Sequence, residues 1–170
     1  MFSRSVVNLF LAGALLALLT LACYRYPPPG WDQYEEMEAI PIENVKERKE
    51  KFDSYTVDQQ LDLYWVVKNS NACCFEDVTD YVMNNCDYYA PLIIERLSTK
   101  YQGAAKPFFL HTLSNMDYYD ACVTSKPDLM KKLEDLKEKI LPDDSETIRD
   151  RKQLINDLID SMIAKARNKT

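Results

Sequence analysis

The residues of this chain that could do chemistry are few, and most of them are cysteines. The five cysteines stand at positions 23, 73, 74, 86 and 122, and the single histidine is His111. One histidine cannot form the two- or three-histidine sites that commonly hold catalytic zinc. His111 follows Leu110 on an expected helix, far in sequence from any cysteine, and we interpret it as a structural or surface residue. We therefore expect no metal site, no cofactor and no catalytic residue.

The sequence carries no motif that is typical of a common enzyme class. Three glycines in 170 residues leave little material for a Gly-rich phosphate loop, and neither G-x-S-x-G nor H-E-x-x-H occurs. A cell-wall hydrolase stays open as an alternative, because its two carboxylates are brought together by the fold rather than by the sequence. The net charge of -6 opposes nucleic-acid binding, which needs a basic surface.

The four later cysteines restrict each other's pairing. If 75–85 is one helix, Cys74 and Cys86 lie about 18 Å apart, whereas a disulfide needs Cα atoms within about 7 Å. A bond between the adjacent Cys73 and Cys74 would strain the backbone. If successive helices run antiparallel, the ends of the second and fourth helices share one side, which favours a Cys86–Cys122 disulfide. Cys73 and Cys74 would then be free thiols or a vicinal pair.

Residues 1–22 have the order of features that is typical of a secretory signal. Arg4 precedes an apolar run from Val6 to Ala22, and small residues stand at the end of that run. The alternative is an uncleaved membrane anchor. Its apolar length of roughly 17 residues would be at the lower limit for crossing a hydrocarbon core of about 30 Å.

The end of this run, Leu19-Thr20-Leu21-Ala22-Cys23, resembles the lipobox of bacterial lipoprotein precursors. Ala22 is the small residue that the family has before the cut, whereas Thr20 and Leu21 depart from its commonest form. The resemblance implies that Cys23 is acylated and becomes the N-terminus, so that acyl chains attach the protein to a membrane. Tyr24 stands where members retained at the inner membrane commonly have aspartate, which implies an outer membrane, facing the periplasm. The alternative is an ordinary secretory signal with a chance cysteine.

Residues 23–54 have the composition of a tether followed by an acidic linker. Pro27-Pro28-Pro29 favours an extended polyproline spacer that cannot join a helix. We expect 31–54 to be a solvated linker in which only Glu43 to Phe52 could form a short charged helix. Lipidation of Cys23 would also leave four cysteines. An even number is expected in an exported protein, because an odd cysteine would have no partner within the chain.

Residues 55–125 have the pattern of a helical core. Thr56 and Gln59 have the spacing of a capping box, which predicts the start of a helix. The segments Pro91–Ser98 and Pro107–Ser114 resemble each other at an offset of 16 residues, and each should have its proline in a first helical turn. This spacing weakly resembles the helix-pair stacking of HEAT-like repeat proteins.

Residues 126–170 predict a helical hairpin. An apolar stripe runs through Leu129, Leu133, Leu136 and Ile140, and a second runs from Ile148 to Ile163 after a break at Pro142. The whole chain is therefore expected to be all-α, an antiparallel helical stack, HEAT-like or an irregular bundle, with this hairpin at its C-terminus.

The charge of the mature chain is uneven. Residues 24–125 hold nine basic and seventeen acidic residues, a net charge of -8, whereas 126–170 are nearly neutral. An acidic body suits a basic protein partner, and solubility alone is an alternative that explains the same charge. The sequence thus favours a membrane-tethered lipoprotein that acts as a protein–protein interaction module in the bacterial envelope. A periplasmic immunity protein that neutralises a toxin, an envelope hydrolase and a eukaryotic secreted helical protein remain alternatives.

Overall fold

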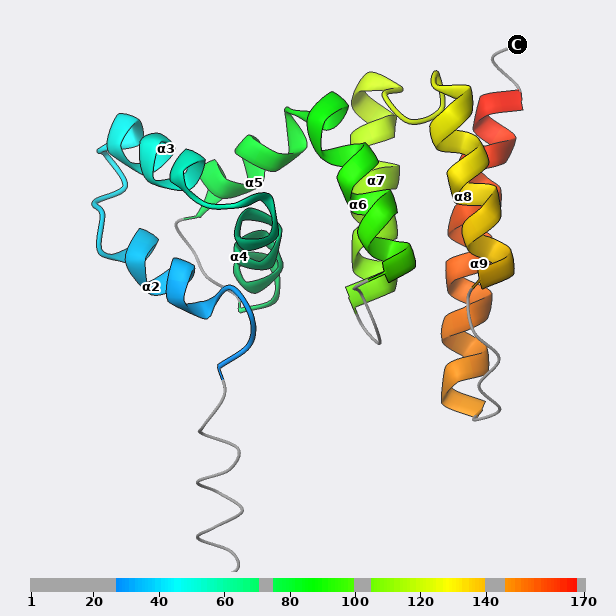
Figure 1. Ribbon diagram of the computed structural model, residues 1–170, viewed down its shortest axis with the longest axis horizontal. Coiled ribbons are helices and arrows are strands. Elements are labelled where there is room, and N and C mark those ends of the chain that lie inside the picture. The colour runs from blue at the N-terminus through cyan, green and yellow to red at the C-terminus, as the bar shows by residue number, and fades with distance from the viewer. Residues whose placement is uncertain (1–26, 71–74, 100–104, 140–145, 168–170) are drawn as a thin grey trace, which may run out of the picture. The chain divides into compact units, whose positions relative to one another are not determined.

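The computed structural model describes residues 27–70, 75–99, 105–139 and 146–167, and it is all-helical over these ranges, with no strand (Figure 1). The side chains of 119, 120, 138, 139, 146–152, 154, 155 and 167 are not described. The described helices are α2 (Trp31–Glu38), α3 (Val45–Ser54), α4 (Val57–Asn69), α5 (Glu76–Met83), α6 (Cys86–Thr99), α7 (Ala105–Asp120), α8 (Pro127–Lys139) and α9 (Glu146–Arg167).

The chain divides into two compact units. Unit 1 comprises Met1–Ala72, whose described part contains α2, α3 and α4, and unit 2 comprises Cys73–Thr170, with α5 to α9. The division falls between α4 and α5, both of which belong to the helical core expected over 55–125. Each unit has buried apolar residues of its own, so each is described separately.

Unit 1 is built around α4, and the expected linker is part of it. Helix α2 packs against both α3 and α4, and Met37 and Phe52 are almost completely buried together with Leu61 and Tyr64. The expectation of a solvated linker over 31–54 is therefore wrong. The prediction failed because Met37 and Phe52 stand among many charged residues, so the periodic pattern of apolar residues is weak. Burying each of them nevertheless contributes about 1.5–3 kcal/mol, which is enough to dock a short helix.

Helix α4 begins where the sequence predicted. The Thr56 hydroxyl accepts a hydrogen bond from the Gln59 amide at 3.3 Å, and the Gln59 side chain accepts one from the Thr56 amide at 2.9 Å. This reciprocal pair satisfies two amides that the first helical turn leaves without partners. Helix α4 ends at Asn69, and the amide of Ser70 donates to the carbonyl of Val66 at 2.9 Å.

Unit 2 consists of two helical hairpins and the short helix α5. Helices α6 and α7 run antiparallel, as do α8 and α9, and the two hairpins lie side by side (Figure 1). Helix α6 neighbours both α7 and α8, and α9 neighbours both α7 and α8. Helix α5 packs on α6 with Val78 and Val82 buried. The four longer helices therefore enclose a common core.

The repeated segments of α6 and α7 contribute equivalent residues to this core. Ile93, Ile94 and Leu97 are buried on α6, and the residues 16 positions later are buried on α7, namely Phe109, Leu110 and Leu113. Pro107 is the third residue of α7 and lies in its first turn, as expected. Pro91 does not lie in a first turn, because α6 begins at Cys86 and holds this proline in its interior. The internal match thus reflects two similar buried faces rather than two similar helix starts.

The C-terminal hairpin uses the predicted stripes. Leu129, Leu133 and Leu136 are buried on α8, and Ile159, Met162 and Ile163 are buried on α9. Ile140 and Pro142 lie outside the described residues. Lys137 of α8 forms an ion pair with Asp160 of α9 on the exposed side of the hairpin.

Candidate functional site

The structure describes three of the residues that the sequence singled out. Cys86 and Cys122 are paired, and His111 is exposed on α7. Cys23, Cys73 and Cys74 lie outside the described residues. Among the residues that are described, no group of three or more histidine, cysteine, aspartate or glutamate side chains is arranged to hold a metal ion. No helix in the same ranges is both long enough and apolar enough to span a membrane.

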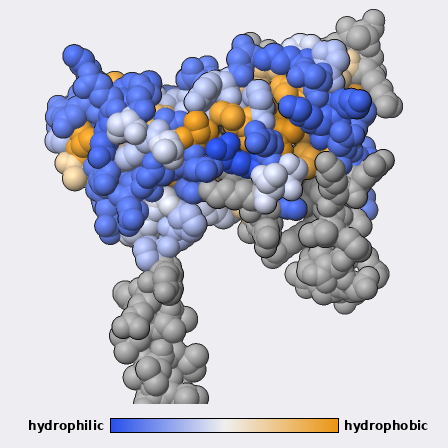
Figure 2. Space-filling view, in the orientation of Figure 1, coloured by the Kyte–Doolittle hydropathy of each residue, from blue (hydrophilic) through white to orange (hydrophobic). Residues whose placement is uncertain are grey.

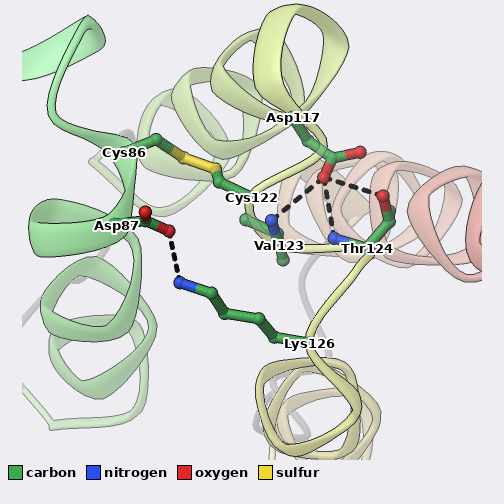
Figure 3. The surroundings of a disulfide bond; sticks show 7 residues. All are labelled: Cys86, Asp87, Asp117, Cys122, Val123, Thr124 and Lys126. Atoms are coloured by element: carbon green, nitrogen blue, oxygen red, sulfur yellow. Dashed lines mark hydrogen bonds and ion pairs between the residues drawn. A yellow bond between two sulfur atoms is a disulfide. The ribbon is translucent and has the colours of Figure 1, made fainter.

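The disulfide joins the start of α6 to the turn that follows α7 (Figure 3). The Cα atoms of Cys86 and Cys122 are 6.1 Å apart, within the usual range for a disulfide. The antiparallel logic of the sequence prediction holds, but Cys86 is the first residue of a long helix rather than the last residue of a short one. Both sulfur-bearing residues are buried.

The turn that carries Cys122 is fixed by a buried carboxylate. Asp117 Oδ1 accepts hydrogen bonds from the amides of Val123 and Thr124 at 3.1 and 2.7 Å and from the Thr124 hydroxyl at 2.9 Å (Figure 3). These amides would otherwise be buried without acceptors, which costs about 1–3 kcal/mol each. Beside the disulfide, Lys126 forms an ion pair with Asp87 of α6. This corner therefore ties α6, α7 and the start of α8 together.

The large hydrophobic side chains that the described part of unit 1 leaves exposed lie in the loop between α2 and α3 and at the first residue of α3. Ile42 is 51% exposed and Val45 is 60% exposed, and Pro41 beside them is exposed as well. We call Pro41, Ile42 and Val45 the apolar ridge. Figure 2 shows a hydrophobic patch over this loop, at the left edge of the view, surrounded by hydrophilic surface. Water-exposed apolar residues that adjoin one another are a common mark of a contact surface.

The apolar ridge has an acidic rim. Glu38, Glu43 and Glu47, which flank or interrupt the ridge in the sequence, are all exposed, and the Asn44 side chain donates a hydrogen bond to Glu47 at 3.2 Å. The exposed surface of this loop is thus apolar at its centre and negative at its edge.

A buried arginine holds the apolar ridge in place. Arg48 is only 2% exposed, and its Nη1 donates to the carbonyl of Met37 at 2.7 Å and to that of Ile40 at 2.9 Å. These carbonyls lie at the C-terminal end of α2, where a positive charge also interacts favourably with the helix dipole. The Asn44 amide donates to the Pro41 carbonyl at 3.0 Å, which closes a turn across Ile42. The ridge is therefore presented by a constrained loop.

A second polar contact joins α2 to α3. Glu36 accepts hydrogen bonds from Tyr55 at 2.9 Å and from Lys51 at 2.7 Å. The bond from Lys51, followed by that from Tyr55, lowers the pKa of Glu36 below its usual 4.5. Burial and the neighbouring Glu36 carboxylate raise the pKa of Tyr55 above its usual 10.0. Both shifts favour the charge states that the contact needs near neutral pH.

The expected tether meets unit 1 at a fixed point. Gly30 is buried with a φ of 91°, and a Cβ atom at this position would lie 2.3 Å from the carbonyl carbon of Asp62 in α4. Only glycine permits both this backbone conformation and this approach. Pro28 and Pro29, immediately before it, are exposed. The chain therefore enters unit 1 against the backbone of α4.

A small cleft between α6 and α8 is lined by two carboxylates. Its residues include Glu95 and Ser98 of α6 with Lys132 and Asp135 of α8, and its volume is about 220 Å³. Pockets that enclose a drug-sized ligand usually measure about 300–1,000 Å³. This cleft is the feature of unit 2 on which an enzymatic interpretation would rest.

Sequence reasoning missed the residues that form the apolar ridge and its support. An apolar Ile40-Pro41-Ile42 stretch between acidic segments was a usable indication of an exposed apolar loop. The role of Arg48 could not be found in this way, because its partners are main-chain carbonyls.

No family model, no curated protein and no solved structure matches the chain.

Proposed function

We propose that this protein is a lipid-anchored protein-binding module of the bacterial envelope. The lipobox-like Leu19-Thr20-Leu21-Ala22-Cys23 supports export and acylation of Cys23. Two or three acyl chains bind a membrane durably, because each buried methylene contributes about 0.8 kcal/mol. The Cys86–Cys122 pair supports an oxidising compartment such as the periplasm. Tyr24 after the acylated cysteine favours the outer membrane.

The observation that carries the binding role is the exposed apolar ridge. Ile42 and Val45 are the aliphatic side chains among the exposed large hydrophobics of the described residues, whereas Tyr88 and Tyr118, the others, carry a polar hydroxyl. Contact with another protein would remove these two side chains from water. Rigid presentation by Arg48 lowers the conformational entropy that such contact would cost.

The short tether would keep unit 1 at the membrane surface. Seven residue steps separate Cys23 from Gly30, which at about 3.1 Å per residue in a polyproline conformation reach roughly 22 Å. Because Gly30 is packed on α4, this length is not extended by flexible residues of unit 1. The partner would therefore be a protein at the same membrane surface.

Acylation is tested by labelling the full chain with palmitate in a bacterial host. We expect label and membrane association for the native chain and for a Ser54→Ala variant, and loss of both for Cys23→Ser. Label that survives Cys23→Ser, or a mature chain recovered free of the membrane and starting after residue 23, would overturn the lipoprotein assignment.

Protein binding is tested by site-specific photocrosslinking in intact cells. A photoreactive residue at 42 should give a discrete adduct, whereas one at 153, an exposed position on α9, should give none. Absence of any adduct from position 42 would count against a binding role for the apolar ridge.

An immunity protein is a narrower form of the same proposal. The acidic rim of the apolar ridge would then meet the basic site of a toxin. A toxin gene beside this one, and rescue of toxin-treated cells by the native chain but not by Ile42→Asp, would favour it. The hydrolase alternative predicts instead that Glu95→Gln or Asp135→Asn abolishes cell-wall hydrolysis.

A further inference from the structure

We infer that the apolar ridge docks into an apolar depression surrounded by basic residues on a partner protein. This inference rests on the proposed function, because it names the chemistry of the partner at the same surface. Its basis is the combination of two exposed aliphatic side chains, Ile42 in the constrained loop and Val45 at the start of α3, with exposed acidic residues in and beside this loop.

The acidic character of this surface is not cancelled by the cations of α3. Arg48 is buried against main-chain carbonyls, Lys49 is paired with Asp53, and Lys51 is paired with Glu36. Lys46 lies 3.7 Å from Glu50 one helical turn further along α3, and its side chain is 91% exposed, so one cation stands beside the three carboxylates of the rim. The carboxylates of Glu38, Glu43 and Glu47 therefore set the sign of the potential around the ridge, and a basic surface complements it.

A protein explains this surface better than a lipid bilayer does. The acidic rim would be repelled by anionic headgroups, whereas surfaces that bind anionic lipids carry clusters of Lys and Arg. The same rim attracts a basic protein surface. The charge around Ile42 and Val45 therefore favours a protein partner.

The inference is tested with two short amphipathic helical peptides of defined composition. One peptide consists of leucine and lysine, and the other has the same leucines with glutamate in place of lysine. The target is the mature chain from residue 23 with Cys23→Ser, so that acyl chains do not bind the peptides. We expect saturable binding of the leucine–lysine peptide, weakened by salt, and no binding of the leucine–glutamate peptide.

Substitutions in the apolar ridge separate apolar docking from attraction between opposite charges. Ile42→Asp adds a negative charge, so it would strengthen binding that is only electrostatic. Docking of an apolar side chain predicts the opposite, a Kd for the leucine–lysine peptide raised about tenfold or more. Ser161→Asp, at an exposed position on α9, is the matched control and should leave the Kd unchanged. Unchanged or tighter binding by Ile42→Asp would overturn the inference.

Substitutions in the rim test the electrostatic half of the inference. Changing Glu38, Glu43 and Glu47 together to glutamine should weaken binding and reduce its salt dependence, because attraction to the lysines is lost. All three residues are exposed and glutamine at 47 keeps an acceptor for the Asn44 side chain, so the unfolding temperature should fall only slightly, from the lost interaction of Glu47 with the dipole of α3. A salt dependence equal to that of the native chain would overturn the assignment of these residues.

Two measurements examine other occupants of the apolar ridge. Flotation with vesicles of phosphatidylethanolamine and phosphatidylglycerol should give no binding that Ile42→Asp abolishes. Light scattering should show the same mass for the native chain and for Ile42→Asp at all concentrations. Vesicle binding or self-association that depends on Ile42 would replace the inferred partner with a membrane or a second copy.

The two proposals fail in different ways. Palmitate labelling that survives Cys23→Ser would overturn the lipid anchor and leave the peptide result intact. Conversely, a crosslinked adduct at position 42 in cells combined with no peptide binding would keep the binding role and reject only the basic, apolar partner.

Discussion

Cys86 and Cys122 join helices that run in opposite directions, with Cα atoms 6.1 Å apart across a sequence separation of 36 residues. Closing a loop of this length lowers the entropy of the unfolded chain and stabilises unit 2 by about 4 kcal/mol. The double variant Cys86→Ala/Cys122→Ala should therefore lose about 3–4 kcal/mol in the unfolding of unit 2. Circular dichroism in urea measures this loss.

The tryptophans provide an internal control for that measurement. Both of them, Trp31 and Trp65, belong to unit 1, so tryptophan fluorescence follows the unfolding of unit 1. Removing the disulfide should shift the circular-dichroism transition more than the fluorescence transition. Equal stability of the native chain and the double variant would show that the bond does not form.

Replacing Asp117 should separate its hydrogen bonds from its charge. Asp117→Ala removes the acceptor of three bonds and should destabilise unit 2 by about 3 kcal/mol, because the amides of Val123 and Thr124 stay buried. Asp117→Asn keeps an oxygen for these bonds and should cost less. An Asn variant as unstable as the Ala variant would mean that the charge itself is required.

A change at Ala121 should stabilise the protein. Ala121 has a φ of 50°, a left-handed conformation that costs L-residues with a Cβ atom roughly 1 kcal/mol. Ala121→Gly should therefore raise the stability of unit 2 by about 0.5–1 kcal/mol. Ala164→Gly, at an exposed position within α9, should instead lower it by about 1 kcal/mol. Urea denaturation should give opposite signs for the two substitutions.

A methyl group at Gly30 should disrupt unit 1. Gly30→Ala places a Cβ atom 2.3 Å from the backbone of α4, which cannot move aside as a side chain could. We expect a loss of about 2–4 kcal/mol, from the positive φ and from separation of α2 and α4. Tryptophan fluorescence in urea measures it, with the exposed Pro29→Ala as control. Native stability of Gly30→Ala would show that the tether does not enter against α4.

The contact of Glu36 with Lys51 and Tyr55 predicts a pH dependence for unit 1. Because folding lowers the pKa of Glu36, its contribution is present above the usual value of 4.5 and is lost as the pH falls through the folded-state pKa. Because folding raises the pKa of Tyr55, its contribution is present below the usual 10.0 and is lost as the pH rises toward the folded-state pKa.

Urea midpoints measured by tryptophan fluorescence across pH test both limits. Glu36→Gln should flatten the acidic limb of the profile, and Tyr55→Phe should flatten the alkaline limb. A profile that neither substitution changes would rule out this contact as a source of the pH dependence.

The sequence by itself determined the helical class, the capped start of α4 and the apolar faces of α8 and α9. These features depend on periodicity and on residues three or four positions apart, so the local pattern contains them. The Cys86–Cys122 pair could be predicted as well, because antiparallel helices restrict which ends can meet.

Only the tertiary structure decided the role of residues 31–54 and the apolar ridge. Met37 and Phe52 dock their helices through contacts with α4 that no local pattern records. Arg48 stabilises α2 by binding main-chain carbonyls, which every sequence has. Whether Ile42 and Val45 would be buried or exposed depended on how the loop between α2 and α3 closes, because burial is a property of the packed chain and not of its residues.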